Sequence, residues 1–118
     1  MRVDLPWPPV ALWPNRRVHW NAKAREASNY RHAAFYSVNP KDAKAFRATE
    51  TIPVSVTFCP PDKRRRDLDN MLAAIKAGLD GIALALDVDD AAFAPTLHRG
   101  PVTKRGAVIV EIETGGAD

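Results

Sequence analysis

The most regular pattern of hydrophobic and polar positions lies between residues 67 and 86. Apolar side chains recur there at intervals of three and four residues: Leu68, Met71, Leu72, Ile75, Leu79, Ile82 and Leu86. This spacing gathers them on one stripe of a helix, and an acidic run at 87–90 follows it. The sequence therefore predicts one amphipathic helix over 67–86.

Alternating apolar positions predict strands over 52–59 and 106–113. In the second, Val108, Val110 and Ile112 face one way, and Ile109, Glu111 and Glu113 face the other. Shorter strands are predicted over 2–6, which Pro6 ends, and over 92–99. Helical spacing predicts a helix over 20–37 and a weaker one over 40–48, after an extended loop over 7–19. The order β-α-β-α-β-β predicts one two-layer α+β domain spanning 1–118.

Composition narrows the function only slightly. Lys plus Arg number 17 against 14 for Asp plus Glu, and this net charge of +3 permits a polyanionic partner without requiring one. The single cysteine, Cys59, excludes an intrachain disulfide and a thiolate zinc site, and its apolar surroundings indicate a buried side chain. We find neither the apolar core of a signal peptide nor an apolar stretch of roughly 18–20 residues that could span a bilayer. We therefore expect a soluble, cytoplasmic protein with no membrane partner.

The segment DKRRRDLDN, residues 62–70, is the strongest candidate for chemistry. Four cations, Lys63, Arg64, Arg65 and Arg66, directly precede two carboxylates and an amide, Asp67, Asp69 and Asn70. Each half has a structural interpretation, because basic runs are usually solvated surfaces and Asp67 can be a helix N-cap with Asp69 favoured by the helix dipole. Neither interpretation explains why the arginines stand beside the acids. A metal-dependent phosphodiesterase explains both, since carboxylates hold Mg²⁺ and arginines hold the phosphate backbone.

A helical projection of 67–86 extends this candidate site. At 100° per residue, Asp69, Lys76 and Asp80 fall roughly 80–120° from the centre of the apolar stripe, on one flank. Lys76 can therefore reach back toward Asp69, although an ordinary Lys76–Asp80 pair explains the same positions. We favour that ordinary role for Asp80. The acidic cluster of Asp87, Asp89 and Asp90 opposes the helix dipole, which favours a cation or a basic partner there.

Four segments together resemble the RusA-family Holliday junction resolvases of bacteria and prophages over nearly the full length. They are Leu5-Pro6-Trp7-Pro8-Pro9 with Asn15 shortly after, the RRRDLDN motif within 61–70, Asp89-Asp90, and Pro101-Val102-Thr103-Lys104. LPWPP alone is a weak signal, whereas RRRDLDN followed by DD and PVTK is specific.

The resemblance implies a mixed β-sheet with helices on one side, and a homodimeric, Mg²⁺-dependent DNase, with Mn²⁺ as a substitute. Such enzymes resolve four-way junctions by paired nicks during recombination and repair. By residue matching, Asp67, Asp69 and Asp90 are the metal-binding acids, with Asn70 in support and Asp89 as the rival of Asp90.

The chain departs from the family at the position of its usual lysine, three residues after the asparagine, where Ala73 stands. Either three residues are inserted and Lys76 replaces that lysine, which the projection favours, or the lysine is absent. The second possibility supports an alternative function: a non-cleaving branched-DNA-binding or phage accessory protein. Further phosphate contacts are expected from Arg16, Arg17 and Lys104. The tryptophans are expected in the core or a dimer interface more often than on bases.

Overall fold

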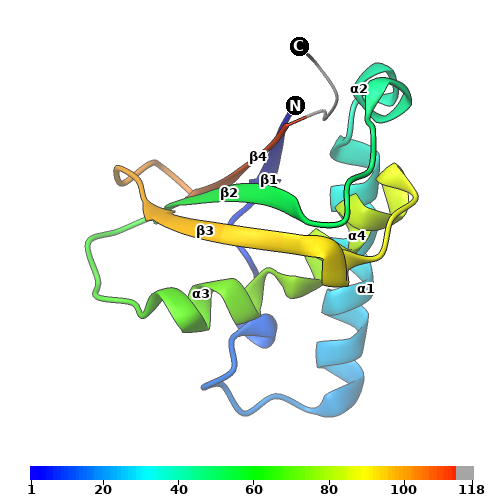
Figure 1. Ribbon diagram of the computed structural model, residues 1–118. Helices are drawn as coiled ribbons and strands as arrows, with labels where there is room; N and C mark the ends of the chain where they lie inside the picture. The colour runs from blue at the N-terminus through cyan, green and yellow to red at the C-terminus, as the bar shows by residue number, and fades with distance from the viewer. Residues whose placement is uncertain (114–118) are drawn as a thin grey trace.

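The computed structural model describes residues 1–113, and within them a four-stranded sheet and its helices form one α+β domain (Figure 1). The strands are β1 (Arg2–Pro6), β2 (Ile52–Cys59), β3 (Phe93–Arg99) and β4 (Ala107–Ile112). The helices are α1 (Trp20–Ser37), α2 (Pro40–Ala45), α3 (Leu68–Ala74) and α4 (Lys76–Leu86), with short 3-10 turns η1 (Val10–Leu12) and η2 (Asp90–Ala92). None of the helices in this part of the chain is long and apolar enough to cross a membrane.

The sheet is mixed, with strand order β1-β4-β2-β3. Strand β4 runs antiparallel to both β1 and β2, whereas β2 and β3 are parallel. The predicted mixed sheet is therefore confirmed. Parallel pairing of β2 and β3 requires the chain to cross back under the sheet between them, and α3 and α4 form that connection.

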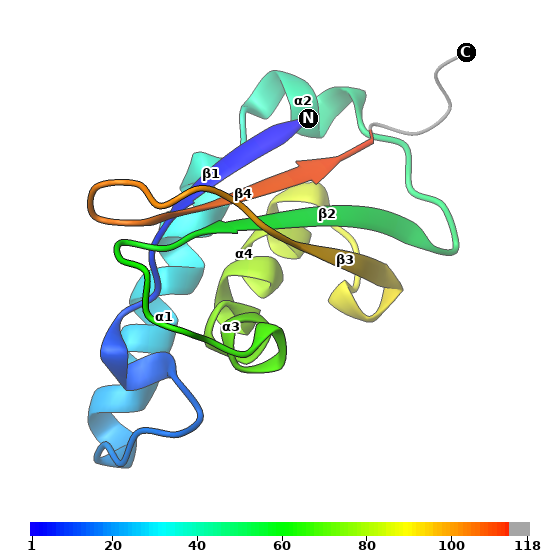
Figure 2. The ribbon, with the colours of Figure 1, turned by 90° about the vertical axis from the view of Figure 1, so that its left-hand side faces the viewer.

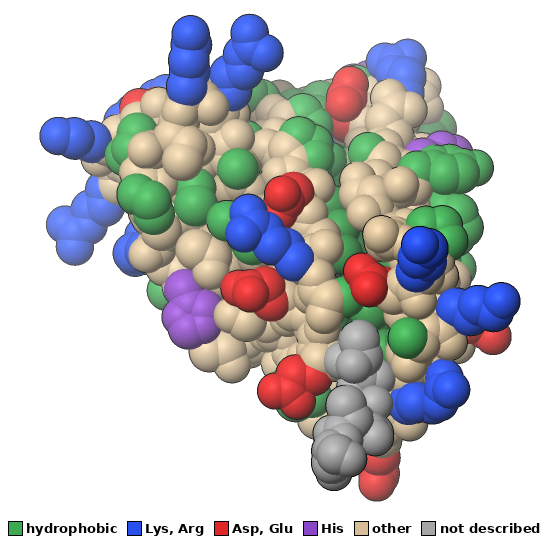
Figure 3. Space-filling model, turned by 90° about the horizontal axis from the view of Figure 1, so that it is seen from above, with side chains coloured by type: hydrophobic (Ala, Val, Ile, Leu, Met, Phe, Trp, Pro, Cys, Tyr) green, Lys and Arg blue, Asp and Glu red, His purple; other side chains and the backbone are tan. Residues whose placement is uncertain are grey.

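The core lies on one face of the sheet, where α1, α3 and α4 cover it (Figure 2). Alternate residues of three strands point into it: Val3, Leu5, Ile52, Val54, Val56, Phe58, Val108, Val110 and Ile112. The predicted two sides of β4 are confirmed, because Glu111 and Glu113 are exposed. Figure 3 looks down on the open face, where several acidic side chains lie near the middle and basic ones project at both the left and the right edges.

The predicted continuous helix over 67–86 is wrong, because it breaks at Ile75. The N–H of Ile75 donates to the carbonyl of Leu72, three residues back, at 3.2 Å, instead of continuing the four-residue pattern. The break lets α3 lie under the sheet while α4 turns to pack along α1 (Figure 1). Ile75 itself is fully buried, so the residue at the break is part of the hydrophobic core.

Candidate functional site

Three of the four segments that carry the resemblance meet at one end of the sheet. Pairing places Pro6 beside Ala107, Ala107 beside Cys59, and Phe58 beside Arg99. The loops that leave or enter these residues are 7–19, 60–67 and 100–106, so they emerge together. We call this the loop end of the sheet.

The β3–β4 loop is fastened to the end of β2. The Thr103 N–H donates to the Pro60 carbonyl at 3.0 Å, and its hydroxyl reaches the Cys59 carbonyl at 3.4 Å. Gly106 adopts a left-handed φ of 71°, and a Cβ at this position would lie 2.9 Å from Trp7 and 3.0 Å from Pro61. The tight approach that only glycine permits here brings the loop against both other segments.

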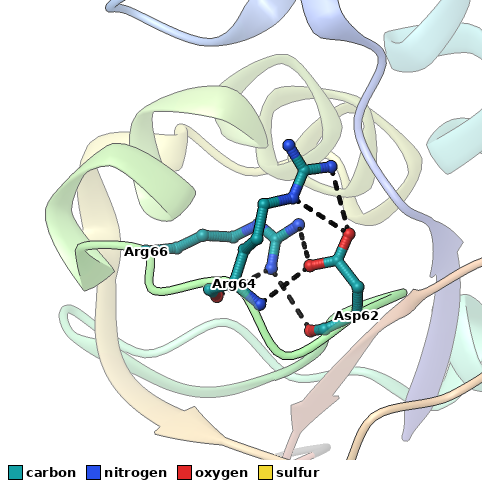
Figure 4. Close-up of polar contacts among 3 residues, drawn as sticks. All are labelled: Asp62, Arg64 and Arg66. Carbon is teal, nitrogen blue, oxygen red and sulfur yellow. Dashed lines mark hydrogen bonds and ion pairs between the residues drawn. The ribbon is translucent and has the colours of Figure 1, made fainter.

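Asp62 organises the arginine run from its first position (Figure 4). Its carboxylate pairs with Arg64 at 3.1 Å and with Arg66 at 2.9 Å, and it also accepts the Arg64 backbone N–H at 2.9 Å. These hydrogen bonds lower the pKa of Asp62 to about 2. The sequence carries a signal for this role, because Asp62 stands two and four residues before Arg64 and Arg66.

Two tryptophans complete the loop end beside Arg66. The Arg66 guanidinium lies 5.3 Å from the centre of the Trp7 ring, within cation–π range. The Trp7 and Trp13 rings are 5.7 Å apart, and the Trp13 indole N–H donates to the Pro8 carbonyl at 3.3 Å. Both indoles are half-buried and pack against the edge of the hydrophobic core, as expected, and they also line this site.

A cavity of about 470 Å³ opens between the N-terminal loop over 7–19 and the segment over 61–70. We call it the cleft. Its walls include both indoles, Arg16 with Asn15 from the N-terminal loop, and residues 64–67 with Asn70 from the other segment. Four arginines and one carboxylate line it, so its electrostatic character suits an anion.

Asp67 and Asp69 stand at the start of α3 with exposed side chains. Asp67 occupies the N-cap position, yet its side chain makes no capping hydrogen bond. The structural interpretation of Asp67 as a helix cap therefore does not account for its carboxylate. Asp67 and Asn70 also line the cleft, so the acids adjoin the arginines in space as well as in sequence.

Asp90 stands on a different element from these two acids. It is the first residue of η2, the turn that directly precedes Phe93, and Phe93 pairs with Ile52 at the opposite end of β2 from the loop end. Asp89 caps η2 by accepting the Ala91 N–H at 2.9 Å, which gives it a local structural role. Within residues 1–113, no group of three or more His, Cys, Asp or Glu side chains is arranged to hold a metal ion. Asp90 as a third ligand stays a prediction.

The break at Ile75 removes the straight helix that the projection of Lys76 and Asp80 beside Asp69 assumed, so Lys76 in the site stays a prediction. Lys76 is exposed at the first position of α4. Asp80 pairs with Arg31 of α1 at 2.7 Å, so the expected Lys76–Asp80 pair is also wrong. Asp80 therefore has the structural role expected of it, but its ion-pair partner is Arg31 and not Lys76.

The remaining predicted phosphate contacts are exposed cations. Lys63, Arg17 and Lys104 lie on the loops of the loop end, and Arg99 joins them by donating to the Arg66 carbonyl at 2.8 Å. Sequence reasoning missed Arg99, because nothing in its local pattern distinguishes it from any charged strand end.

The chain is 35% identical to an uncharacterized protein of Xylella fastidiosa (strain Temecula1 / ATCC 700964) across 117 aligned residues, which cover 93% of this chain and 74% of the relative. No family model matches the chain. The chain belongs to the same protein family as this Xylella fastidiosa protein.

Proposed function

We propose that this protein is a Mg²⁺-dependent endodeoxyribonuclease of the RusA type that nicks Holliday junctions or other branched DNA. The observation that supports it best is the cleft, where exposed Asp67 adjoins an arginine-lined wall at the end of the sheet that gathers three motif segments. Acids that could hold a divalent cation and guanidinium groups that could hold a phosphate thus share one surface.

The residues divide the work of phosphodiester hydrolysis. Asp67 and Asp69 would hold the cation, which stabilises charge on the phosphate and acidifies its bound water when present. The exposed arginines would hold the strand so that water attacks phosphorus and the bond to one ester oxygen breaks. That oxygen takes a proton and leaves as a hydroxyl, and the phosphate remains on the other strand end.

The direct experiment compares wild type with Asp69→Asn on a synthetic four-way junction. We expect Mg²⁺-dependent nicking by wild type and at least a roughly 100-fold loss in the variant, with junction binding retained, because the exposed side chain contributes charge without a packing role. Asp4→Asn, an exposed acid on the open face, is the matched control. A wild-type protein that binds junctions and never cuts them with Mg²⁺ or Mn²⁺ refutes the proposal.

The same assay decides two assignments. Asp90→Asn should abolish nicking if the acid is a ligand after rearrangement or assembly, and unchanged nicking removes it from the site. Lys76→Ala should slow nicking only if Lys76 replaces the lysine that Ala73 lacks.

Ala73 also favours the second candidate, a non-cleaving branched-DNA-binding or phage accessory protein. Paired nicks require two sites, so a two-fold homodimer is part of the nuclease proposal. Binding without nicking would support the accessory function instead.

A further inference from the structure

We infer that the cleft is a subsite for one unpaired nucleotide of a DNA strand, with its base against the indoles and its phosphate on the arginines. This inference rests on the proposed function for its biological setting, but its evidence is the cleft itself. The volume of about 470 Å³ falls within the roughly 300–1,000 Å³ of ligand-sized sites. A cavity of this volume suits one nucleotide better than a duplex.

The arginines divide into those that build the cleft and those that remain for a ligand. Arg66 is only 15% exposed, pairs with Asp62 and covers Trp7, so it is structural. Arg16 and Arg65 are exposed and make no ion pair within residues 1–113. They come from the two different segments that face the cavity. The guanidinium groups of Arg16 and Arg65 could therefore hold one phosphate from both segments.

The indoles explain why the base must be unpaired. Bases inside a duplex present their edges to a protein, whereas an unpaired base exposes a face that can stack on an aromatic ring. Trp7 and Trp13 are half-buried and line the cavity wall, so an unpaired base that enters the cavity could stack on them. Unpaired nucleotides occur in flaps and where base pairs open at a branch point, so this subsite would supply selection for branched DNA beside the acids.

The test measures quenching of tryptophan fluorescence by an eight-residue oligothymidylate in EDTA, so that no nicking occurs. Trp13→Ala should weaken binding about 5- to 150-fold, the measured worth of one stacked base. Trp13→Phe should retain most of the wild-type affinity. The matched control is Trp20→Ala, whose indole is 72% exposed outside the cleft, and it should bind within about twofold of wild type.

Arg65→Ala keeps the inference testable should Trp13→Ala fail to fold, because Arg65 has no structural partner among the described residues. It should lower the slope of log affinity against log salt by about 0.7, the value for one phosphate on a single strand. Unchanged binding by Trp13→Ala, or an unchanged slope for Arg65→Ala, overturns the subsite. Thymidine monophosphate that competes as well as the oligonucleotide also overturns it, since the site would then take free nucleotides.

Junction nicking with Mg²⁺ is measured separately on the same proteins. A wild type that binds through Trp13 without nicking refutes the nuclease and keeps the subsite. If wild type nicks junctions but Trp13→Ala binds the oligonucleotide as tightly as wild type, the subsite is refuted and the nuclease proposal stands.

Discussion

Different interactions stabilise two regions of the molecule. One region is the seam between α1 and α4, and the other is the loop end of the sheet. At the seam, Gly81 brings the helices so close that a Cβ would lie 2.2 Å from the Arg31 carbonyl oxygen, beside fully buried Ala34. At the loop end, contacts run through the partly exposed Asp62 carboxylate and half-buried indoles. Substitutions at the seam should therefore change stability, and those at the loop end should change ligand binding with less effect on stability.

The largest effect on stability is expected from Gly81→Ala. Alanine favours a helix over glycine by about 1 kcal/mol, but the added methyl group must push α1 away. We expect a net loss toward the upper end of the roughly 1–3 kcal/mol typical of overpacking, measured by urea denaturation. Leu84→Ala on the same helix, 56% exposed, should change the free energy of unfolding by less than about 0.5 kcal/mol. If Gly81→Ala and Leu84→Ala change the free energy of unfolding equally, the close approach of α1 and α4 is not the cause.

A smaller effect is expected from Tyr30→Phe, which joins the two regions. The buried Tyr30 hydroxyl donates to the Pro6 carbonyl at 2.6 Å, directly before Trp7, and burial raises the pKa of this phenol. Losing one such bond should cost about 1 kcal/mol in thermal or urea unfolding. Tyr36→Phe is the control, because Tyr36 is 80% exposed on the same helix. A loss as large for Tyr36→Phe would show that the Pro6 contact is not the cause.

The smallest effect on stability is expected from Asp62→Asn, and it should depend on pH. The pKa of Asp62 is lowered from 3.8 to about 2 in the folded protein. Its contribution is therefore present above 3.8 and lost as pH falls through about 2. Urea unfolding between pH 2 and 6 should show a variant that is slightly less stable at pH 6 and equal to wild type near pH 2. A difference that does not vary over this range contradicts the assignment.

Local patterns predicted most elements because their signals are contained within one segment. The predicted helix over 20–37 matches α1, and the strand over 52–59 matches β2. The predicted strand over 92–99 begins one residue before β3, and the one over 106–113 is one residue longer than β4 at each end. The weaker helix over 40–48 is shorter, because α2 ends before Phe46, which is buried. The loop over 7–19 contains η1, a turn too short for periodicity to predict.

The sequence by itself determined the charged motif, the α+β order and the apolar stripe that packs under the sheet, because these depend on neighbours along the chain. Only the tertiary structure decided which motifs meet. Parallel pairing of β2 with β3 puts the start of β3, which η2 and Asp90 precede, at the opposite end of β2 from the loop end. The break at Ile75 divides the predicted helix into α3 and α4, so a straight-helix projection no longer relates Lys76 to Asp69. Trp7, Trp13 and the arginines of residues 64–66 share a cleft because the ends of β1 and β2, distant in sequence, flank the start of β4 in the sheet, which no local pattern encodes.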